Sequence, residues 1–318
     1  MKAGVLHSYG TNPIYQDFET PQPQPAEVLI TVKAAAIKQV DKSKASGKHY
    51  TSYPQLPIVP GVDGTGTLPD GTPIYALGIT GMMAEKALVK DNNWVVLPDE
   101  IDFETAAALP NALVGSDMAL LYKGKLQPGQ TVLINGATGA TGKIAVQMAK
   151  NRGAKKVIAT GRNQAILEEL KSLGADEIIL LTQDDEAIIK QIQQLHTESP
   201  IDVVIDYLWG HPVELILTAI KSLPPHPLKI VTVGEMAGST VNLTSGILRS
   251  TQIELLGSGI GSLSMQDIAK YLKTELPAIF KLVVDGKLKM DIEITDLKDI
   301  ETSWAKTEQP GKSIVVKM

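Results

Sequence analysis

A glycine-rich segment contains the residues whose spacing points most directly to chemistry. Residues 131–134 form an apolar run that predicts a short buried strand, and the apolar spacing of residues 143–152 predicts a helix. Glycine lets a backbone approach a ligand closely, and the start of a helix presents free N–H groups and the positive end of its dipole. The segment between strand and helix therefore predicts a phosphate site made by Gly136, Ala137, Thr138, Gly139, Ala140, Thr141 and Gly142. A tight strand-to-helix turn without a ligand is the alternative.

The end of the next expected strand, residues 156–159, indicates which dinucleotide the site would take. An acid at that position would accept bonds from both ribose hydroxyls and select the non-phosphorylated cofactor. The nearest acid here is Glu168, a turn into the following helix. The guanidinium of Arg162 instead offers paired hydrogen bonds to a 2′-phosphate. The sequence thus favours NADPH with Thr160, Gly161 and Arg162 as contacts; the alternative is that Arg162 merely begins an exposed helix.

The elements that would position these residues alternate between strand and helix. Six strands joined by helical crossovers predict a doubly wound parallel sheet. Since ligands of such sheets lie at the carboxyl ends of the strands, Val233, Gly234 and Ser258 are expected nicotinamide-side contacts, with Asp206 and Tyr207 in the same row. The expected strands are 131–134, 156–159, 177–181, 201–207, 228–233 and 253–256, and the expected helices are 143–152, 164–173, 186–196 and 213–222.

The first 110 residues have a different, β-rich pattern. Residues 27–36 begin with alternating apolar residues, as a half-buried strand does, and short strands are expected at 74–77 and 84–89 between turns. Residues 104–121 have helical spacing interrupted by Pro110 and Gly115, which predicts two helices meeting near the proline. Towards the end, residues 265–285 are expected to be helical and residues 312–318 to form a closing strand.

Composition restricts the classes of function. The chain has 318 residues, enough for two domains, and a formal net charge of −5 without a basic run, which argues against nucleic acid or an anionic membrane as partner. The start of the chain lacks the apolar core of a signal peptide and no apolar run reaches membrane-spanning length, so we expect a cytoplasmic protein. There is no cysteine, and the five histidines show no paired spacing, so no metal site is expected. A site made of His and carboxylate ligands from distant parts of the chain is the alternative.

Several linked segments together resemble a known family. They read, in order, MKAGVLHSYG, PAEVLITVKAAAIKQVDKSKASGKHY, LPIVPGVDGTG, ETAAALPNALVGSDMALLYKGKLQPGQTVLINGATGATG, LKSLGADEIIL, IDVVIDYLWG and GKSIVV. Their order and spacing resemble the zinc-free quinone-oxidoreductase branch of the medium-chain dehydrogenase/reductase superfamily. The resemblance implies a GroES-like substrate domain, residues 1–112 and 261–318, and a Rossmann NADPH-binding domain, residues 113–260. It also implies a site in the cleft between them and a homodimer joined at the sheet edge.

Three departures from the family pattern concern the site. Lys38 stands where the family usually has asparagine, although Asp41 is retained. Gly115 and Ser116 replace a Thr-Ala pair, and Thr182 stands where an aromatic residue often follows the third strand. By position in the family segment, Lys38, Tyr50 and Tyr53 are the expected catalytic donors. The alternatives are that Lys38 contacts the cofactor ribose or pairs with Asp41, and that the loop with both tyrosines only packs.

The expected reaction is hydride transfer. A nicotinamide carries the reactive hydrogen, and the protein supplies alignment and a polarising donor. Without zinc or cysteine, a quinone or an α,β-unsaturated carbonyl is the better suited acceptor, since a donor can bond the carbonyl oxygen as enolate charge develops. The rival interpretation is an NADPH-binding regulatory or structural protein with little catalysis.

Overall fold

The computed structural model describes residues 1–49, 51–306 and 311–318. The chain forms two compact units. Unit 1 comprises Met1–Asn111 and Ala269–Met318, and unit 2 comprises Ala112–Ile268. Of the residues singled out from the sequence, Tyr50 lies outside the described residues.

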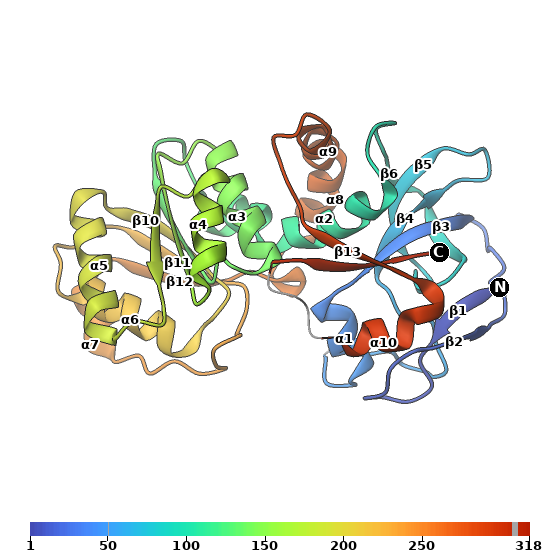
Figure 1. Ribbon diagram of the computed structural model, residues 1–318, viewed down its shortest axis with the longest axis horizontal. Helices are drawn as coiled ribbons and strands as arrows, with labels where there is room; N and C mark the ends of the chain where they lie inside the picture. The colour runs from blue at the N-terminus through green and yellow to red at the C-terminus, as the bar shows by residue number, and fades with distance from the viewer. Residues whose placement is uncertain (50, 307–310) are drawn as a thin grey trace. The chain divides into compact units, whose positions relative to one another are not determined.

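Unit 2 is built on a six-stranded parallel sheet, which confirms the predicted doubly wound architecture (Figure 1). Its central strands are almost wholly buried, as expected when helices cover both faces of a sheet. The spatial order is β12-β11-β10-β7-β8-β9. The strands are β7 (Thr131–Asn135), β8 (Lys156–Gly161), β9 (Glu177–Leu180), β10 (Ile201–Asp206), β11 (Leu228–Thr232) and β12 (Ile253–Gly257).

The helices of unit 2 lie on both faces of this sheet. From β7 the strand order runs one way to β9 and then the other way from β10 to β12, so right-handed crossovers place the two sets of helices on opposite faces. Figure 1 shows α3 and α4 on one side and α5, α6 and α7 on the other. The direction reverses between β7 and β10, which is where ligands of such sheets bind. The helices are α3 (Ala140–Asn151), α4 (Gln164–Ser172), α5 (Asp185–Glu198), α6 (Gly210–Lys221) and α7 (Ser245–Ser250).

Two helix starts in unit 2 follow the local sequence. Asn163 caps α4, because its side chain accepts the backbone N–H of Ile166 at 3.2 Å. Asp184 caps α5 by accepting the N–H of Ala187 at 2.9 Å. Side-chain oxygens at this position satisfy N–H groups that have no partner within the helix.

Unit 1 contains a small closed barrel. Strands β3, β4, β5 and β6 pair in that order, and β3 also pairs with β6, which closes the ring. The sheet continues from β3 through β14 to β13, and β1 and β2 form a separate hairpin. The strands are β1 (Lys2–Val5), β2 (Ile14–Asp17), β3 (Glu27–Ile37), β4 (Asp63–Thr67), β5 (Pro73–Gly78), β6 (Lys86–Val96), β13 (Ile292–Asp296) and β14 (Ser313–Lys317).

The predicted break in the first long helix is wrong. Helix α2 (Phe103–Gly115) continues through Pro110 and ends five residues later, before a π-helical turn, η1 (Ala119–Gly124). Proline removes one helical hydrogen bond, but α2 is largely buried, and its Ala107 and Ala108 pack with Ala34 and Ala36 of β3. Tertiary packing therefore outweighs the local preference of the proline.

The helical segment near the end of the chain is divided in two. Residues 265–285 form α8 (Met265–Thr274) and α9 (Leu276–Val284), separated at Glu275. Pro277 lies in the first turn of α9, where its missing N–H costs no helical bond. No sequence pattern predicts α1 (Gln39–Ala45), α10 (Ile300–Ala305) or β13.

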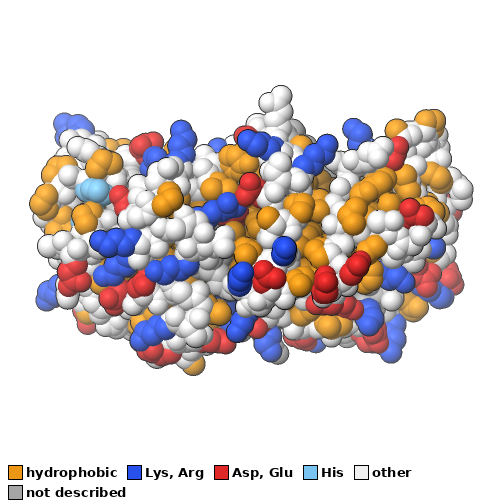
Figure 2. All heavy atoms as spheres, turned by 90° about the horizontal axis from the view of Figure 1, so that it is seen from above, with side chains coloured by type: hydrophobic (Ala, Val, Ile, Leu, Met, Phe, Trp, Pro, Cys, Tyr) orange, Lys and Arg blue, Asp and Glu red, His pale blue; other side chains and the backbone are white. Residues whose placement is uncertain are grey.

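The molecular surface carries mixed charge. Figure 2 shows Lys, Arg, Asp and Glu side chains interspersed over one face. Within the described part of the chain, no helix is both long and apolar enough to span a membrane.

Candidate functional site

The three glycines of the turn after β7 have different reasons to be glycine. Gly136 has a φ of 88°, in the left-handed region, and a Cβ on Gly142 would lie 2.7 Å from the Cα of Ala137, so the fold itself requires both. Gly139 caps α3 with an ordinary φ of −80°, and a Cβ there would have no protein atom within 4 Å. Its missing side chain therefore keeps the space beside the start of α3 open, where an anion can be bound.

The turn is held by the end of the neighbouring strand. The N–H of Ala137 donates to the carbonyl oxygen of Thr160 at 2.7 Å, and the N–H of Gly136 donates to its hydroxyl at 3.2 Å. The Thr160 hydroxyl in turn donates to the side-chain oxygen of Asn135 at 2.7 Å. Thr160 is buried, so its side chain supports the glycine turn. Gly161 leaves room for Thr138, whose Cγ2 would lie 2.4 Å from a Cβ at that position.

A buried carboxylate joins β7 to β10 where the strand order reverses. Asp206 accepts a hydrogen bond from the side-chain amide of Asn135 at 2.8 Å. It also accepts the backbone N–H groups of Leu208 at 3.1 Å and Trp209 at 3.1 Å. Burial raises the pKa of Asp206, and the hydrogen bonds oppose that rise. The carboxylate therefore fixes both the glycine turn and the backbone that follows β10.

Arg162 directly follows β8 and is exposed. Within the described residues its guanidinium has neither a hydrogen bond nor an ion pair. Glu168, the nearest acid on the following helix, is already engaged with Lys171 at 2.7 Å and Gln164 at 2.8 Å. The arginine charge is thus available to a ligand phosphate.

A cavity of about 410 Å³ opens at the ends of β11 and β12. Among the residues predicted here, Val233 and Gly234 already donate their N–H groups to the carbonyl oxygen of Asp206, at 2.7 and 3.3 Å. Ser258 is 8% exposed, and its hydroxyl has no hydrogen-bond partner among the described residues. Of the three predicted nicotinamide-side contacts, Ser258 is therefore the one whose polar group, the hydroxyl, is free to bind a ligand. The lining consists of Trp209, Thr232, Val233, Gly234, Glu235, Ser239, Gly257, Ser258, Gly259 and Ser262.

Lys38, the first of the predicted donors, lies in a buried cluster of charges in unit 1. Its ammonium donates to the carboxylate of Asp63 and, at 3.2 Å, to the carbonyl oxygen of Ala36. Asp41, the partner considered from the sequence, lies farther away at 3.9 Å. Asp63 also accepts the hydroxyl of Tyr75 at 2.7 Å. These contacts favour the ion-pair interpretation of Lys38, with Asp63 as the closer partner.

The second carboxylate of the cluster holds the backbone around it. Asp41 accepts the N–H groups of Lys38 at 3.2 Å and Val62 at 3.0 Å. Burial raises the pKa of Asp41 to about 6, although the Lys38 charge opposes the rise. Burial also disfavours the charge on Lys38, but attraction to Asp63 and Asp41 outweighs it and raises the pKa of that ammonium.

Tyr53 is placed differently from Lys38. Its hydroxyl is buried and has no hydrogen-bond partner within the described part of the chain, and burial raises its pKa. Its ring lies under the ammonium of Lys44, 5.0 Å from the ring centroid. Tyr53 thus has an unused donor, whereas the charge of Lys38 is already paired.

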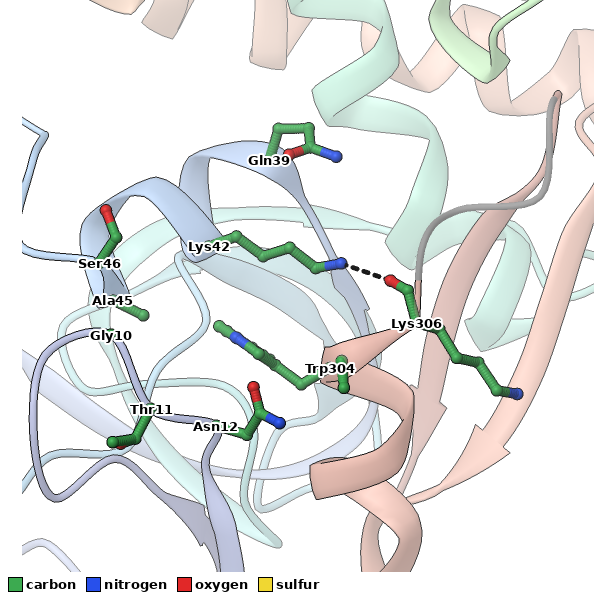
Figure 3. Close-up of a pocket in the computed structure, with 10 residues that line it drawn as sticks. Gly10, Thr11, Asn12, Gln39, Lys42, Ala45, Ser46, Trp304 and Lys306 are labelled. Carbon is green, nitrogen blue, oxygen red and sulfur yellow. Dashed lines mark hydrogen bonds between the residues drawn. The ribbon is translucent and has the colours of Figure 1, made fainter.

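Unit 1 also has a hollow that the sequence did not predict, of about 400 Å³ (Figure 3). Helix α1, helix α10 and the β1–β2 loop surround it, and the indole of Trp304 lies among them. The ammonium of Lys42 donates across one side to the carbonyl oxygen of Lys306 at 2.8 Å. The residues that line this hollow come from three segments that are distant in the sequence, so no local motif predicts it.

Metal-ligating residues do not gather in the described part of the chain. No three His, Asp or Glu side chains there lie close enough together to hold a metal ion. The chain has no cysteine.

Comparisons with known proteins agree with this architecture. Residues 140–275 match the family described as zinc-binding dehydrogenase. Quinone oxidoreductase-like protein 2 of Bos taurus is 26% identical over 309 residues, covering 93% of this chain and 86% of that protein. The chloroplastic NADPH-dependent alkenal/one oxidoreductase of Arabidopsis thaliana is 32% identical over 208 residues, 58% of this chain and 53% of that protein.

A solved structure extends the similarity to both units. The quinone oxidoreductase of Pseudomonas syringae pv. Tomato DC3000 is 27% identical, with a TM-score of 0.81 over 99% of this chain and 100% of that one. These similarities extend over nearly the whole chain. They include both the parallel sheet with its glycine turn and the small β-barrel. Over nearly its whole length the chain is thus similar to quinone oxidoreductases, and these similarities support the zinc-free quinone-oxidoreductase branch of the medium-chain dehydrogenase/reductase superfamily.

Proposed function

We propose that the protein is an NADPH-dependent oxidoreductase that transfers hydride to a quinone or an α,β-unsaturated carbonyl compound. The observation that carries the proposal is the pairing of an open helix start at Gly139 with an unpartnered arginine, Arg162, at the end of the next strand. A helix start suits a pyrophosphate, and a free guanidinium suits a 2′-phosphate. The name of the Arabidopsis thaliana relative, an NADPH-dependent alkenal/one oxidoreductase, supports the same cofactor and acceptor.

In this proposal unit 2 binds the whole cofactor. Gly136 to Gly142 hold the pyrophosphate over α3, and Arg162 holds the 2′-phosphate. The nicotinamide half occupies the cavity with Ser258, whose free hydroxyl suits the carboxamide of that ring. The nicotinamide supplies the hydride, and the protein supplies alignment.

Residues of unit 1 provide the donor to the substrate oxygen. As the acceptor is reduced, negative charge develops on its carbonyl oxygen, and a positioned O–H group stabilises it. Tyr53 has an unpartnered hydroxyl for this role, and Tyr50 is proposed from its place in the sequence. The ammonium of Lys38 is bound to Asp63, so its proposed part is to fix this segment.

In this proposal the two domains expected from the sequence bind the substrate and the cofactor separately. Residues 1–112 and 261–318 form the substrate domain, and residues 113–260 bind NADPH. A homodimer is proposed through the outer edge of β12, the last strand in its sheet. An unpaired strand edge offers backbone groups to a second copy.

A second candidate is an NADPH-binding regulatory or structural protein with little catalysis. The observation in its favour is the ion pair that occupies Lys38, one of the predicted catalytic donors. Incubating the protein with NADPH and a panel of quinones, enones and alkenals separates the two. Oxidation of NADPH with at least one acceptor supports the enzyme. Tight binding of NADPH without oxidation across the panel supports the rival.

A further inference from the structure

Trp209 stands in a backbone conformation that does not suit tryptophan. Its φ is 53° and its ψ is −163°, a region that side chains with a Cβ rarely adopt. It is also the cap residue of α6, a position that usually holds a side-chain oxygen, and its side chain makes no cap hydrogen bond. Local conformation therefore gives no reason for tryptophan here.

The surrounding backbone holds this conformation from both sides. The carboxylate of Asp206 accepts the N–H of Trp209 at 3.1 and 3.2 Å, and the carbonyl oxygen of Leu208 accepts the N–H of Ala237 at 2.7 Å. Gly210, which follows, has a φ of 58° and lies against Ala237, whose oxygen would be 3.1 Å from a Cβ at Gly210. The strain is thus built into a well-supported segment.

The position of Trp209 explains what the strain achieves. The side chain is half-buried, packs on the apolar core of unit 2 and lines the 410 Å³ cavity. Ser258 lines the same cavity with a buried, unpartnered hydroxyl. Gly257 and Gly259 also line it, and Cβ atoms built on either would meet no protein atom within 4 Å. The cavity thus combines an aromatic residue, a free hydroxyl and two glycines that leave space.

We propose that Trp209 is a binding residue for the planar, amide-bearing ring of the cofactor, held in place by Asp206. This inference rests on the proposed NADPH function and deepens it. The indole stacks on the nicotinamide ring, and the hydroxyl of Ser258 bonds its carboxamide. Aromatic stacking favours such a ring over a fragment that lacks it.

The test compares two ligands that share the adenosine half of the cofactor. NADPH carries the nicotinamide ring, and adenosine 2′,5′-bisphosphate does not. Dissociation constants are measured by calorimetry for the wild type and for Trp209→Leu, Trp209→Phe and Ser258→Ala. Trp94→Leu, in β6 of unit 1, is the matched control.

We expect Trp209→Leu to weaken NADPH about tenfold and to leave the bisphosphate within twofold of the wild type. Trp209→Phe retains most of the NADPH affinity, and Ser258→Ala again weakens only NADPH. An unchanged ratio of the two affinities in Trp209→Leu and Ser258→Ala overturns the inference. If Trp209→Leu does not fold, the other two variants test the inference. It then requires that Ser258→Ala weakens NADPH but not the bisphosphate and that Trp209→Phe retains most of the NADPH affinity. A wild type that binds no NADPH refutes the proposed function itself, and this inference with it.

Discussion

Replacing Lys38 by methionine removes the ammonium from a buried cluster that also holds Asp41 and Asp63. The three side chains are 3%, 0% and 5% exposed, so water reaches none of them freely. Methionine keeps the apolar stem, which isolates the loss of charge. Removing one partner of a buried ion pair costs about 3–5 kcal/mol, because the other charge stays buried without compensation. For a unit of this size that corresponds to a fall in Tm of roughly 6–20 °C.

The loss should depend on pH. Without the ammonium, which opposes the rise, the pKa of Asp41 in the folded protein moves further above its value in the unfolded chain. The folded variant then binds more protons than the unfolded chain, so its stability falls as pH increases. We expect the difference between wild type and Lys38→Met to be smaller at pH 5 than at pH 8.

Thermal unfolding of purified variants measures this effect, with turnover recorded in parallel. Lys2→Met is the matched control, because Lys2 pairs with Asp17 at 2.9 Å while 42% and 80% exposed, and an ion pair so open to water contributes little to stability. Lys38→Met combined with Asp63→Asn should recover part of the loss. A Lys38→Met protein that keeps the wild-type Tm at both pH values but loses turnover would show that Lys38 is catalytic and refute the structural role.

Three further predictions concern the cofactor site and the buried acid. Arg162→Ala should weaken NADPH roughly 10- to 100-fold and leave NADH within twofold, since charge-assisted bonds to the 2′-phosphate are lost; fluorescence titration that finds equal weakening contradicts this. Gly139→Val should keep the wild-type Tm but lose NADPH, whereas Gly136→Val, at a φ of 88°, should destabilise the fold; unchanged NADPH affinity in Gly139→Val argues against the pyrophosphate position. Because the pKa of Asp41 is raised from 3.8 to about 6, wild-type stability should decline as pH rises from about 4 to about 6. Asp41→Asn should lack that part of the decline in urea unfolding, and identical pH slopes would disprove it.

The parallel sheet could be predicted closely from the sequence because its strands are apolar runs between glycine turns and amphipathic helices. The end of β7 was expected at residue 134 and lies at Asn135, and the other strand ends agree to within two residues. Burial on both faces leaves such strands little freedom in composition. The pattern therefore defined the position of the glycine turn and of Arg162.

The features that the sequence did not reveal depend on contacts between distant segments. Pro110 was expected to break a helix, but packing of α2 on β3 keeps the helix continuous. Asp63, the close partner of Lys38, lies 25 residues away in the sequence. It is the first residue of a strand rich in glycine, and nothing in that local pattern indicates an ion pair with Lys38. The sequence places Asp206 in the row of strand ends that face the cofactor but does not reveal its bonds to Asn135 and Trp209, because these arise only when β7 and β10 become neighbours.

The central claim is that the hydrogen leaving the nicotinamide of NADPH arrives on the substrate. The most direct measurement uses NADPH with deuterium at the transferred position of the nicotinamide ring and an α,β-unsaturated ketone, followed by mass spectrometry and proton NMR of the product. We expect one deuterium per product molecule, at the carbon β to the carbonyl. A reduced ketone that carries no deuterium at that carbon would contradict it.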